Sequence, residues 1–342
     1  MSFTRLTPED IVISAESITS ALFSNSTPTL TTFFTSSAQK ASSAGSYYID
    51  VYNLNTTNTS SEVQFSVAYG NLDGSGSVVY NPLISGSSPT RTTYGQYRNL
   101  VIGDENVNFN FGSGTCRDIF VISVERSRFK EKLMPGTFNL NIKSGSTTLR
   151  LTDDSLNATT ISYKDSGRVY NIVSGSNGKA ILNAQFPGVQ AGYNPSGSYG
   201  WFLPDVGLIV LNGEALKLAP ASGGLSQVIP NSYNTNDENH IEFFKIISGA
   251  GSFTLNSEET ITSDFVFVRV KNSEFNYSTN PSFISGSTGE VIFSNFVNNP
   301  QTYVTTIGLY NDNNDLLAVA KLSKPLPKDF TKEALLRCKL DF

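Results

Sequence analysis

The sequence has little charge and few of the residues that most catalytic and metal sites need. Lys, Arg, Asp and Glu make up 15% of the 342 residues, and the chain has two cysteines and one histidine. A zinc site needs clustered Cys and His ligands, so this set predicts no metal. His240 would have to serve any mechanism based on imidazole, and no G-x-S-x-G turn presents a serine to it. We therefore expect no cofactor and interpret His240 as a structural residue of a loop or strand end.

Cysteine usage also argues against a disulfide framework. Cys116 and Cys338 are separated by most of the chain, and nothing in their spacing requires them to pair. Free cysteines behave as small hydrophobic residues. We expect two buried thiols.

Charge balance and hydropathy exclude two further classes of protein. The formal net charge is −5 and the pI is about 5.1, so no basic surface is expected to follow a nucleic-acid backbone. The first residues lack the basic flank and apolar run of a secretion signal, and no later stretch approaches a membrane span. We expect a soluble protein made in the cytoplasm, with no nucleic-acid partner and no membrane insertion.

What the sequence does have is a succession of strand-like runs separated by turns. Ser, Thr and Asn are abundant, and they compete with helix formation. The strand-like runs are residues 47–54, 63–69, 106–111, 118–124, 137–142, 169–173, 206–211, 242–247, 265–270 and 291–296. Their spacing predicts a mainly β fold of antiparallel, β-sandwich-like domains with few short helices.

A change of pattern near residue 155 predicts two domains. Residues 1–155 would form an N-terminal β domain and residues 156–342 a C-terminal β domain. Residues 126–134 are predicted to form one or two helical turns before Pro135 and Gly136 end them. Residues 23–37 are too rich in Thr and Ser to predict a long helix.

The last nine residues have the pattern of a strand that is buried on one face. Leu336, Cys338, Leu340 and Phe342 alternate with charged residues. Side chains at a period of two are buried only when another strand lies alongside, so we expect a neighbouring strand to hold this terminus. We interpret residues 334–342 as an assembly strand that completes a sheet in the same subunit or in an adjacent one.

The residues just before this strand predict a hairpin and a spacer. Apolar runs at 303–310 and 316–322 flank the turn-like residues 311–315. Pro325 and Pro327 cannot donate to a sheet through their nitrogens, so we expect residues 324–330 to be an extended spacer.

Three kinds of motif have a chemical interpretation, but turn chemistry explains each of them better. The adjacent pairs Asp153–Asp154, Asp104–Glu105 and Glu258–Glu259 would point to opposite faces of a strand, so we interpret them as solvated turn carboxylates. Residues 311–315 lack the Gly and the downstream Glu of a calcium loop. Residues 70–76 are Gly-rich but lack the Lys of a phosphate-binding loop.

Aromatic residues in loop-like sequence are the remaining candidates for a binding site. They are Tyr94, Tyr97, Tyr193, Tyr199 and Trp201. Tyr and Trp are enriched at protein interfaces, so we expect these residues to anchor one. Stacking against a sugar is the alternative.

Seven stretches carry a resemblance to a known family. They are residues 63–76 (VQFSVAYGNLDGSG), 93–101 (TYGQYRNLV), 118–136, 167–175, 202–213, 265–283 and 303–342. On these stretches the chain resembles virion structural proteins of contractile-tailed bacteriophages, notably those that infect marine cyanobacteria, and the resemblance extends over most of the chain. The resemblance implies a non-enzymatic part of the virion tail, most plausibly a baseplate or adjoining component. Its partners would be other tail proteins and further copies of itself in a symmetric oligomer.

Two alternatives remain open at this point. The chain could be a receptor-binding tail adhesin in which Tyr199, Trp201 and the loops around them contact a surface glycan. It could also be a polysaccharide depolymerase that uses two carboxylates, since their spacing in sequence is unconstrained. The sequence has no period of 20 to 50 residues, so the repeat of a parallel β-helix is missing.

Overall fold

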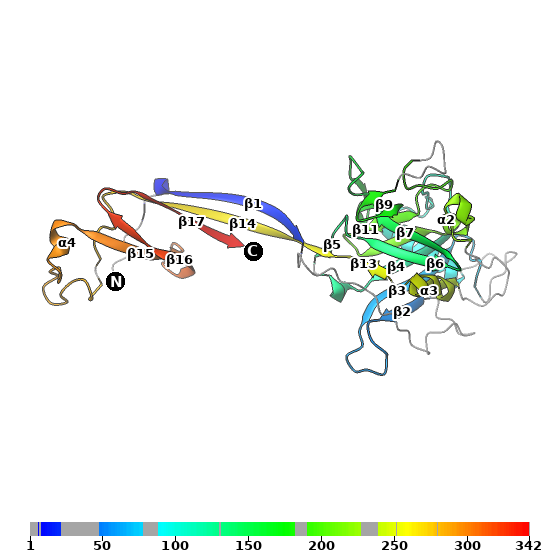
Figure 1. Ribbon diagram of the computed structural model, residues 1–342, viewed down its shortest axis with the longest axis horizontal. Coiled ribbons are helices and arrows are strands. Elements are labelled where there is room, and N and C mark those ends of the chain that lie inside the picture. The colour runs from blue at the N-terminus through cyan, green and yellow to red at the C-terminus, as the bar shows by residue number, and fades with distance from the viewer. Residues whose placement is uncertain are drawn as a thin grey trace. The chain divides into compact units, whose positions relative to one another are not determined.

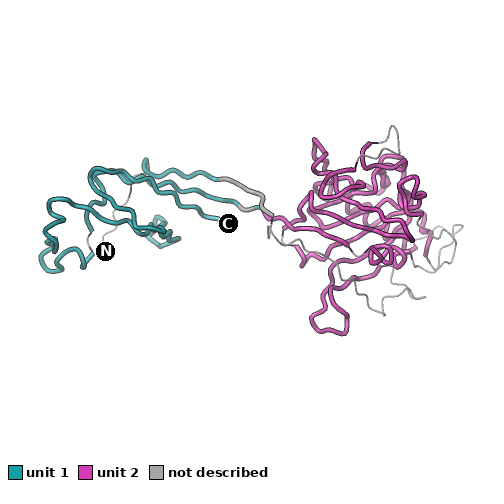
Figure 2. Tube along the Cα trace, viewed as in Figure 1, with its two compact units in different colours: residues 1–19, 260–342 teal, residues 20–259 magenta. Residues whose placement is uncertain are grey.

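The computed structural model describes residues 6, 8–21, 48–77, 88–129, 131–181, 190–226, 239–250, 252–278 and 280–341. Over these residues the fold is mainly β with antiparallel strand pairs, as the sequence predicts (Figure 1). The chain forms two compact units (Figure 2). Unit 1 comprises residues 1–19 and 260–342, and unit 2 comprises residues 20–259.

The predicted domain boundary near residue 155 is wrong. Strands β7 (Thr147–Asp153) and β9 (Gly167–Ser176) lie on either side of it and pair with each other, with Thr152 opposite Val173. Unit 1 instead takes its residues from both ends of the chain. Strands that are distant in sequence can pair in one sheet, and a local change of composition does not reveal such pairing.

One large sheet forms the frame of unit 2. Its strands, in spatial order, are β13 (Ser252–Thr254), β6 (Asn139–Ser144), β7, β9, β11 (Gly200–Leu203), β12 (Leu208–Asn212), β4 (Asp118–Val124), β3 (Val63–Asn71) and β2 (Tyr48–Tyr52). The short strands β8 (Ser162–Lys164) and β10 (Lys179–Ala180) pair with β9. The sheet is curled, so that strands near opposite ends of its order come together. Phe65 on β3 contacts Phe253 on β13, with 5.3 Å between ring centroids.

Both faces of this sheet are covered near β4. Phe120 points toward α3 (Asn239–Ala250), where its ring stacks on Phe243 at 4.5 Å between centroids. Val121, the next residue, belongs to the core on the opposite face, together with Tyr94 of α1 (Pro89–Ile102). The short helix α2 (Gly213–Lys217) follows β12 and adds two buried apolar residues to the core on the α3 side. This double burial explains why β4 is an almost continuous hydrophobic run.

Two of the helices were not predicted from the sequence. Residues 242–247, predicted as a strand, belong to α3. Phe243, Ile246 and Ile247 follow the spacing of one helical face, but a short apolar run fits both periods. Helix α1 contains three Thr and a Gly, all weak helix formers, and packing of its buried residues against the sheet outweighs their propensity.

Three further predictions of local structure differ from the structure. Residues 106–111 contain only an isolated bridge at Asn110. Residues 291–296 contain a bridge at Val291 and the start of the short helix α4 (Asn295–Asn298). Of the helical turns predicted at 126–134, the structure has one, the 3-10 helix η3 (Arg126–Arg128), followed by β5 (Lys132–Leu133). Residues 23–37 lie outside the described residues.

Unit 1 is built on three strands of a four-stranded sheet, whose fourth strand, β5, pairs with the first residues of β14 (Ser257–Val270), and on a hairpin. The three strands have the order β1 (Ile11–Ala21), β14, β17 (Ala334–Asp341), and the hairpin consists of β15 (Gln301–Tyr310) and β16 (Leu316–Asp329). The predicted hairpin is confirmed, since the Asn311 side chain accepts the Asp315 N–H at 2.7 Å across the turn. One face of the hairpin packs against the buried residues of β14 and β17.

The predicted spacer is part of this hairpin. Residues 324–329 continue β16, and Pro327 lies opposite Tyr303 of β15. A two-stranded sheet consists of edge strands only, and an edge strand tolerates proline because one of its sides has no ladder of hydrogen bonds to lose.

Candidate functional site

The C-terminal strand is held in a sheet by its own chain. β17 pairs with β14 from Ala334 opposite Val270 to Asp341 opposite Ser263. Leu336 and Cys338 are buried, Leu340 is half-buried, and the residues between them are exposed. The predicted alternation is therefore confirmed, and Phe342 lies outside the described residues. A role of this strand in assembly stays a prediction.

The two cysteines are buried free thiols, as expected. Cys116 lies in unit 2 and Cys338 in unit 1. Burial raises the pKa of both thiols, that of Cys116 to about 12. Neither is therefore a thiolate at neutral pH, and thiolate is the nucleophilic form of cysteine.

The predicted interface aromatics do not form a surface. Tyr94 and Tyr97 lie on α1 rather than in a loop, and Trp201 lies on β11. Tyr94, Tyr199 and Trp201 are buried, whereas Tyr97 and Tyr193 are half-buried. The interface interpretation is therefore wrong for the three buried residues, and a glycan-binding role loses both aromatic residues that it depended on.

These aromatic side chains fix loops to the core instead. The Tyr94 hydroxyl donates to the Cys116 carbonyl at 2.8 Å and accepts the Phe109 N–H at 3.2 Å. The Tyr199 hydroxyl donates to the Gly223 carbonyl at 2.6 Å. Buried Tyr residues commonly use their hydroxyl in this way. Loop-like sequence around an aromatic residue thus did not distinguish a loop anchor from an exposed contact.

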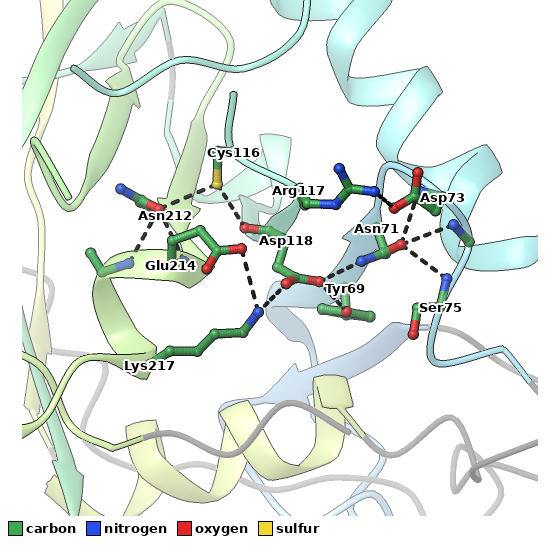
Figure 3. Close-up of polar contacts among 12 residues, drawn as sticks. Tyr69, Asn71, Asp73, Ser75, Cys116, Arg117, Asp118, Asn212, Glu214 and Lys217 are labelled. Atoms are coloured by element: carbon green, nitrogen blue, oxygen red, sulfur yellow. Dashed lines mark hydrogen bonds and ion pairs between the residues drawn. The ribbon is translucent and has the colours of Figure 1, made fainter. Parts of the chain in front are cut away.

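A buried polar network centred on Asp118 gathers functional groups from several elements of unit 2 (Figure 3). Asp118 begins β4, and its carboxylate accepts from the Tyr69 hydroxyl at 2.5 Å and from the Asn71 amide at 2.6 Å. The same carboxylate forms an ion pair with Lys217 of α2. Lys217 also contacts Glu214 at 3.4 Å. The network therefore joins β3, β4 and α2.

Asn71 extends the network to the loop at 70–76. Its side-chain oxygen accepts the N–H groups of Asp73, Gly74 and Ser75 at 3.0, 2.9 and 2.9 Å. Gly74 has φ of 93°, a left-handed conformation that favours glycine. The turn predicted here is confirmed, and Asn71 determines its shape.

Asn212 plays the same part for α2. Its side-chain oxygen accepts the N–H groups of Glu214 and Ala215 at 3.0 and 3.3 Å, which caps the helix. The Cys116 thiol lies 3.2 Å from this oxygen and 3.0 Å from the Asp118 carbonyl. The thiol thus contributes to the packing of the cap.

Electrostatics fix the protonation states of Tyr69 and Lys217 near neutral pH. Burial and the charge of Asp118 both raise the pKa of Tyr69. Burial lowers the pKa of Lys217, but the charges of Asp118 and Glu214 more than offset it, so the net shift is upward. The Tyr69 phenol is thus neutral and Lys217 is charged, and both bind the Asp118 carboxylate. The arrangement can fix the relative positions of three elements, and sequence reasoning missed it because its members are distant in sequence.

His240 differs from its predicted position. It lies in the first turn of α3, and burial lowers its pKa to about 4, so the imidazole is neutral at pH 7. Its Nε2 has no hydrogen-bond partner among the described residues. The side chain behaves as part of the apolar face of the helix.

The interpretation of the acidic pairs as solvated carboxylates is wrong for three of their members. Asp153, Asp154 and Glu258 are buried. Asp153 accepts the Gly136 N–H, with 2.9 Å to its Oδ2, whereas Asp154 accepts the Asn171 N–H at 2.9 Å. The two neighbours face different partners, as the strand geometry predicts. Burial raises the pKa of both.

The described residues show neither a metal-ligand cluster nor a helix suited to cross a membrane. In these parts of the chain, no three His, Cys, Asp or Glu side chains gather where they could hold a metal ion. None of the helices formed by the described residues has the length and apolar character that a membrane crossing requires.

The exposed large apolar side chains are concentrated in the smaller unit. Among the described residues there are 23 of them, and 15 belong to unit 1. These are Ile11, Val12, Ile13, Phe275, Tyr277, Ile292, Phe293, Val297, Tyr303, Tyr310, Leu316, Leu317, Val319, Phe330 and Leu335. Exposed apolar side chains that lie close together can mark sites of interaction, and Leu316, Leu317 and Val319 are near neighbours on β16. Comparison of the chain with protein-family models, with curated proteins and with solved structures finds no match.

Proposed function

We propose that the chain is a non-enzymatic structural subunit of a bacteriophage tail, in the baseplate or adjoining it, that acts by packing against other tail proteins and further copies of itself. The observation that supports this most is the concentration of exposed apolar side chains in unit 1. Large contiguous apolar patches are rare on monomeric soluble proteins, so clustered exposed apolar side chains favour a protein contact. The family resemblance supplies the location in a tail.

The hairpin shows how unit 1 can serve two contacts at once. Its inner face places Ile307 opposite Ala320, and both residues pack on the core of unit 1. Its outer face carries Tyr303, Leu317 and Val319, which are exposed. The inner face is thus apolar and covered, whereas the outer face carries these apolar side chains beside Lys321 and is not covered by the described residues. An outer face of this composition fits a protein partner that covers it during assembly.

Local contacts also brace the outer face of the hairpin. The Tyr310 ring lies over Gly308, so that a Cβ at this glycine would come within 2.7 Å of the ring. The hairpin turn at 311–315 is closed by two hydrogen bonds between the Asn311 side chain and Asp315, one donated and one accepted by Asn311. A surface held in one conformation loses little entropy when it binds.

Incorporation into virus particles tests the proposal. Leu317→Asp combined with Val319→Asp places two charges on the outer face of the hairpin, while Leu156→Asp adds one at an exposed apolar site of unit 2. Particles purified after complementation of the virus that encodes the chain should contain the wild-type chain and the Leu156 variant. The amount of the hairpin variant in purified particles should be lower by about tenfold or more, since charges inside an apolar contact are strongly unfavourable.

Circular dichroism of the purified variants establishes that each is folded. Absence of the wild-type chain from purified particles would refute the proposal, and so would normal incorporation of the folded hairpin variant.

Deletion of residues 334–342 should abolish either soluble folding or incorporation, because β14 would lose its β17 partner over eight residue pairs.

A further inference from the structure

We propose that the outer edge of β1 in unit 1 pairs with the same edge of a second copy of this chain, in an antiparallel and two-fold symmetric contact. This inference rests on the proposed function in so far as a tail subunit occurs in several copies. It adds the surface, the partner and the symmetry of one contact.

The first part of β1 is exposed on both of its faces. Ile11, Val12, Ile13 and the two residues after them are all exposed, with 68% of Ile13 accessible to solvent. Successive side chains of a strand point to opposite faces. Three consecutive β-branched apolar residues therefore leave this part of the sheet uncovered above and below, which favours a strand that lies between other strands.

The edge itself is open as well. β1 stands at one end of the order β1-β14-β17, and no strand among the described residues pairs with its outer side (Figure 1). The N–H and C=O groups along such an edge are a template for another strand. The edge therefore offers main-chain hydrogen bonds beside an apolar surface.

The other edge of the same sheet, formed by β17, carries charged side chains that disfavour pairing with another strand. β17 presents Arg337, Lys339 and Asp341 in alternation on its exposed face. Charged side chains, Lys above all, are a common means of preventing edge-to-edge pairing. Residues 11–15 carry no charge at all. One edge of the sheet is thus protected against strand addition and the other is not.

Charge and shape favour a second copy as the occupant of this edge. Residues 11–15 of two copies can lie side by side without like-charge repulsion among them, and Glu16 is the one charged residue of β1. Two β17 edges would bring Arg337 and Lys339 of both copies together. Ile and Val also form favourable cross-strand pairs with each other. An antiparallel contact between identical strands is two-fold symmetric and closed, so it gives a dimer and no fibre.

A pair of lysine substitutions tests which edge forms the contact. Ile13→Lys and Leu335→Lys alter side chains of matched exposure, 68% and 70%, on opposite edges of one sheet. We expect the full wild-type chain to form dimers at concentrations between about 1 and 100 µM in analytical ultracentrifugation, with Ile13→Lys weakening dimerisation by about tenfold or more. Leu335→Lys should leave it unchanged.

Single cysteines test the symmetry. Val12→Cys, Ile13→Cys and Ser14→Cys introduce an exposed thiol, while the native Cys116 and Cys338 are buried. Near the two-fold axis of an antiparallel pair a residue faces its own copy, so at least one of the three variants should form a disulfide-linked dimer under mild oxidation. In a head-to-tail contact, a cysteine would not meet its own copy. Leu335→Cys should remain unlinked.

Three outcomes would overturn the inference: a wild-type chain that is monomeric over the whole concentration range, equal weakening by both lysine variants, or no cross-link at any of the three positions. Its failure is distinguishable from failure of the proposed function. A monomeric chain that is still found in purified particles would refute the β1 contact alone.

Discussion

Arg168 on β9 binds Glu258 at the start of β14, with 2.6 Å between Nη2 and Oε1. The same guanidinium contacts Asp205 through Nε at 3.0 Å and Nη2 at 2.8 Å. Burial lowers the pKa of Arg168, but the hydrogen bonds to Asp205 and Glu258 more than offset this, so the net shift is upward. The guanidinium is therefore always charged. One cation thus fixes the first residues of β14 to the large sheet of unit 2.

Arg168→Met should destabilise unit 2 by about 2–3 kcal/mol, because it leaves the buried Glu258 carboxylate without its partner. Urea unfolding followed by the fluorescence of Trp201, the only tryptophan, measures the free energy of unfolding of this unit. Arg117→Met is the matched control, since its ion pair with Asp73 is exposed and should contribute less than about 1 kcal/mol. Equal losses of unfolding free energy in the two variants would contradict a stabilising role of the buried Arg168–Glu258 ion pair.

The Asp118 network predicts a second large effect. Asp118→Asn keeps the shape of the side chain but removes the charge that Lys217 binds and turns an acceptor into a donor beside Tyr69 and Asn71. We expect a loss of about 2–4 kcal/mol in the same unfolding assay. Glu214→Gln changes the more exposed partner of Lys217 and should cost about 0.5 kcal/mol. A mild effect of Asp118→Asn would show that the network is not needed to position β3, β4 and α2.

His240 predicts a pH dependence of stability. Its pKa falls from 6.5 to about 4 on folding because of burial, so the unfolded chain takes up the proton first as the pH decreases. The contribution is fully present above about pH 6.5 and is lost progressively toward pH 4, by about 3 kcal/mol in total. His240→Leu should remove this part of the slope. The carboxylates titrate in both proteins, so the difference in unfolding free energy between them isolates the histidine, and a difference that is constant with pH would contradict the prediction.

The strands were predictable where one physical signal decided the structure. β4 is a continuous apolar run between turn residues, and β17 alternates strictly, so both were identified nearly to the residue. α3 was predicted as a strand because Phe243, Ile246 and Ile247 are apolar at spacings that both periods allow. In such a run, only tertiary packing decides between helix and strand.

The polar network and the division into units could not be predicted, for a different reason. Asp118 and Lys217 are 99 positions apart, and Asp118 and Tyr69 are 49 apart. Such contacts depend on the strand order of the sheet, which alternation does not encode. The same holds for β1, whose place beside β14 joins residues from the two ends of the chain. Local patterns identified some of the elements, such as β4 and β17, whereas long-range pairing determined the architecture.

Lys328 provides a test of unit 1. Its side chain is fully buried, and its ammonium group donates to the Asn276 side chain at 2.8 Å and to the carbonyls of Asn272 and Asp329 at 3.0 and 2.9 Å. Burial lowers the pKa of Lys328. All three acceptors are uncharged, so the bonds serve to hold the segment after β14 against β16 rather than to neutralise the lysine.

Lys328→Met keeps about the same side-chain length and removes the ammonium group that donates all three hydrogen bonds. The buried Asn276 side-chain oxygen then lacks its hydrogen-bond donor. We expect unit 1 to lose about 1–3 kcal/mol, because an unsatisfied buried polar group costs about this much. Trp201 lies in unit 2, so the measurement must be amide hydrogen exchange in β14, β16 and β17. Lys324→Met, four residues earlier on the same strand, changes an exposed lysine and should leave exchange unaltered. If both variants exchange like the wild type, the segment after β14 is held by its other contacts, among them the hydrogen bond from Thr302 to the Phe275 carbonyl at 2.6 Å.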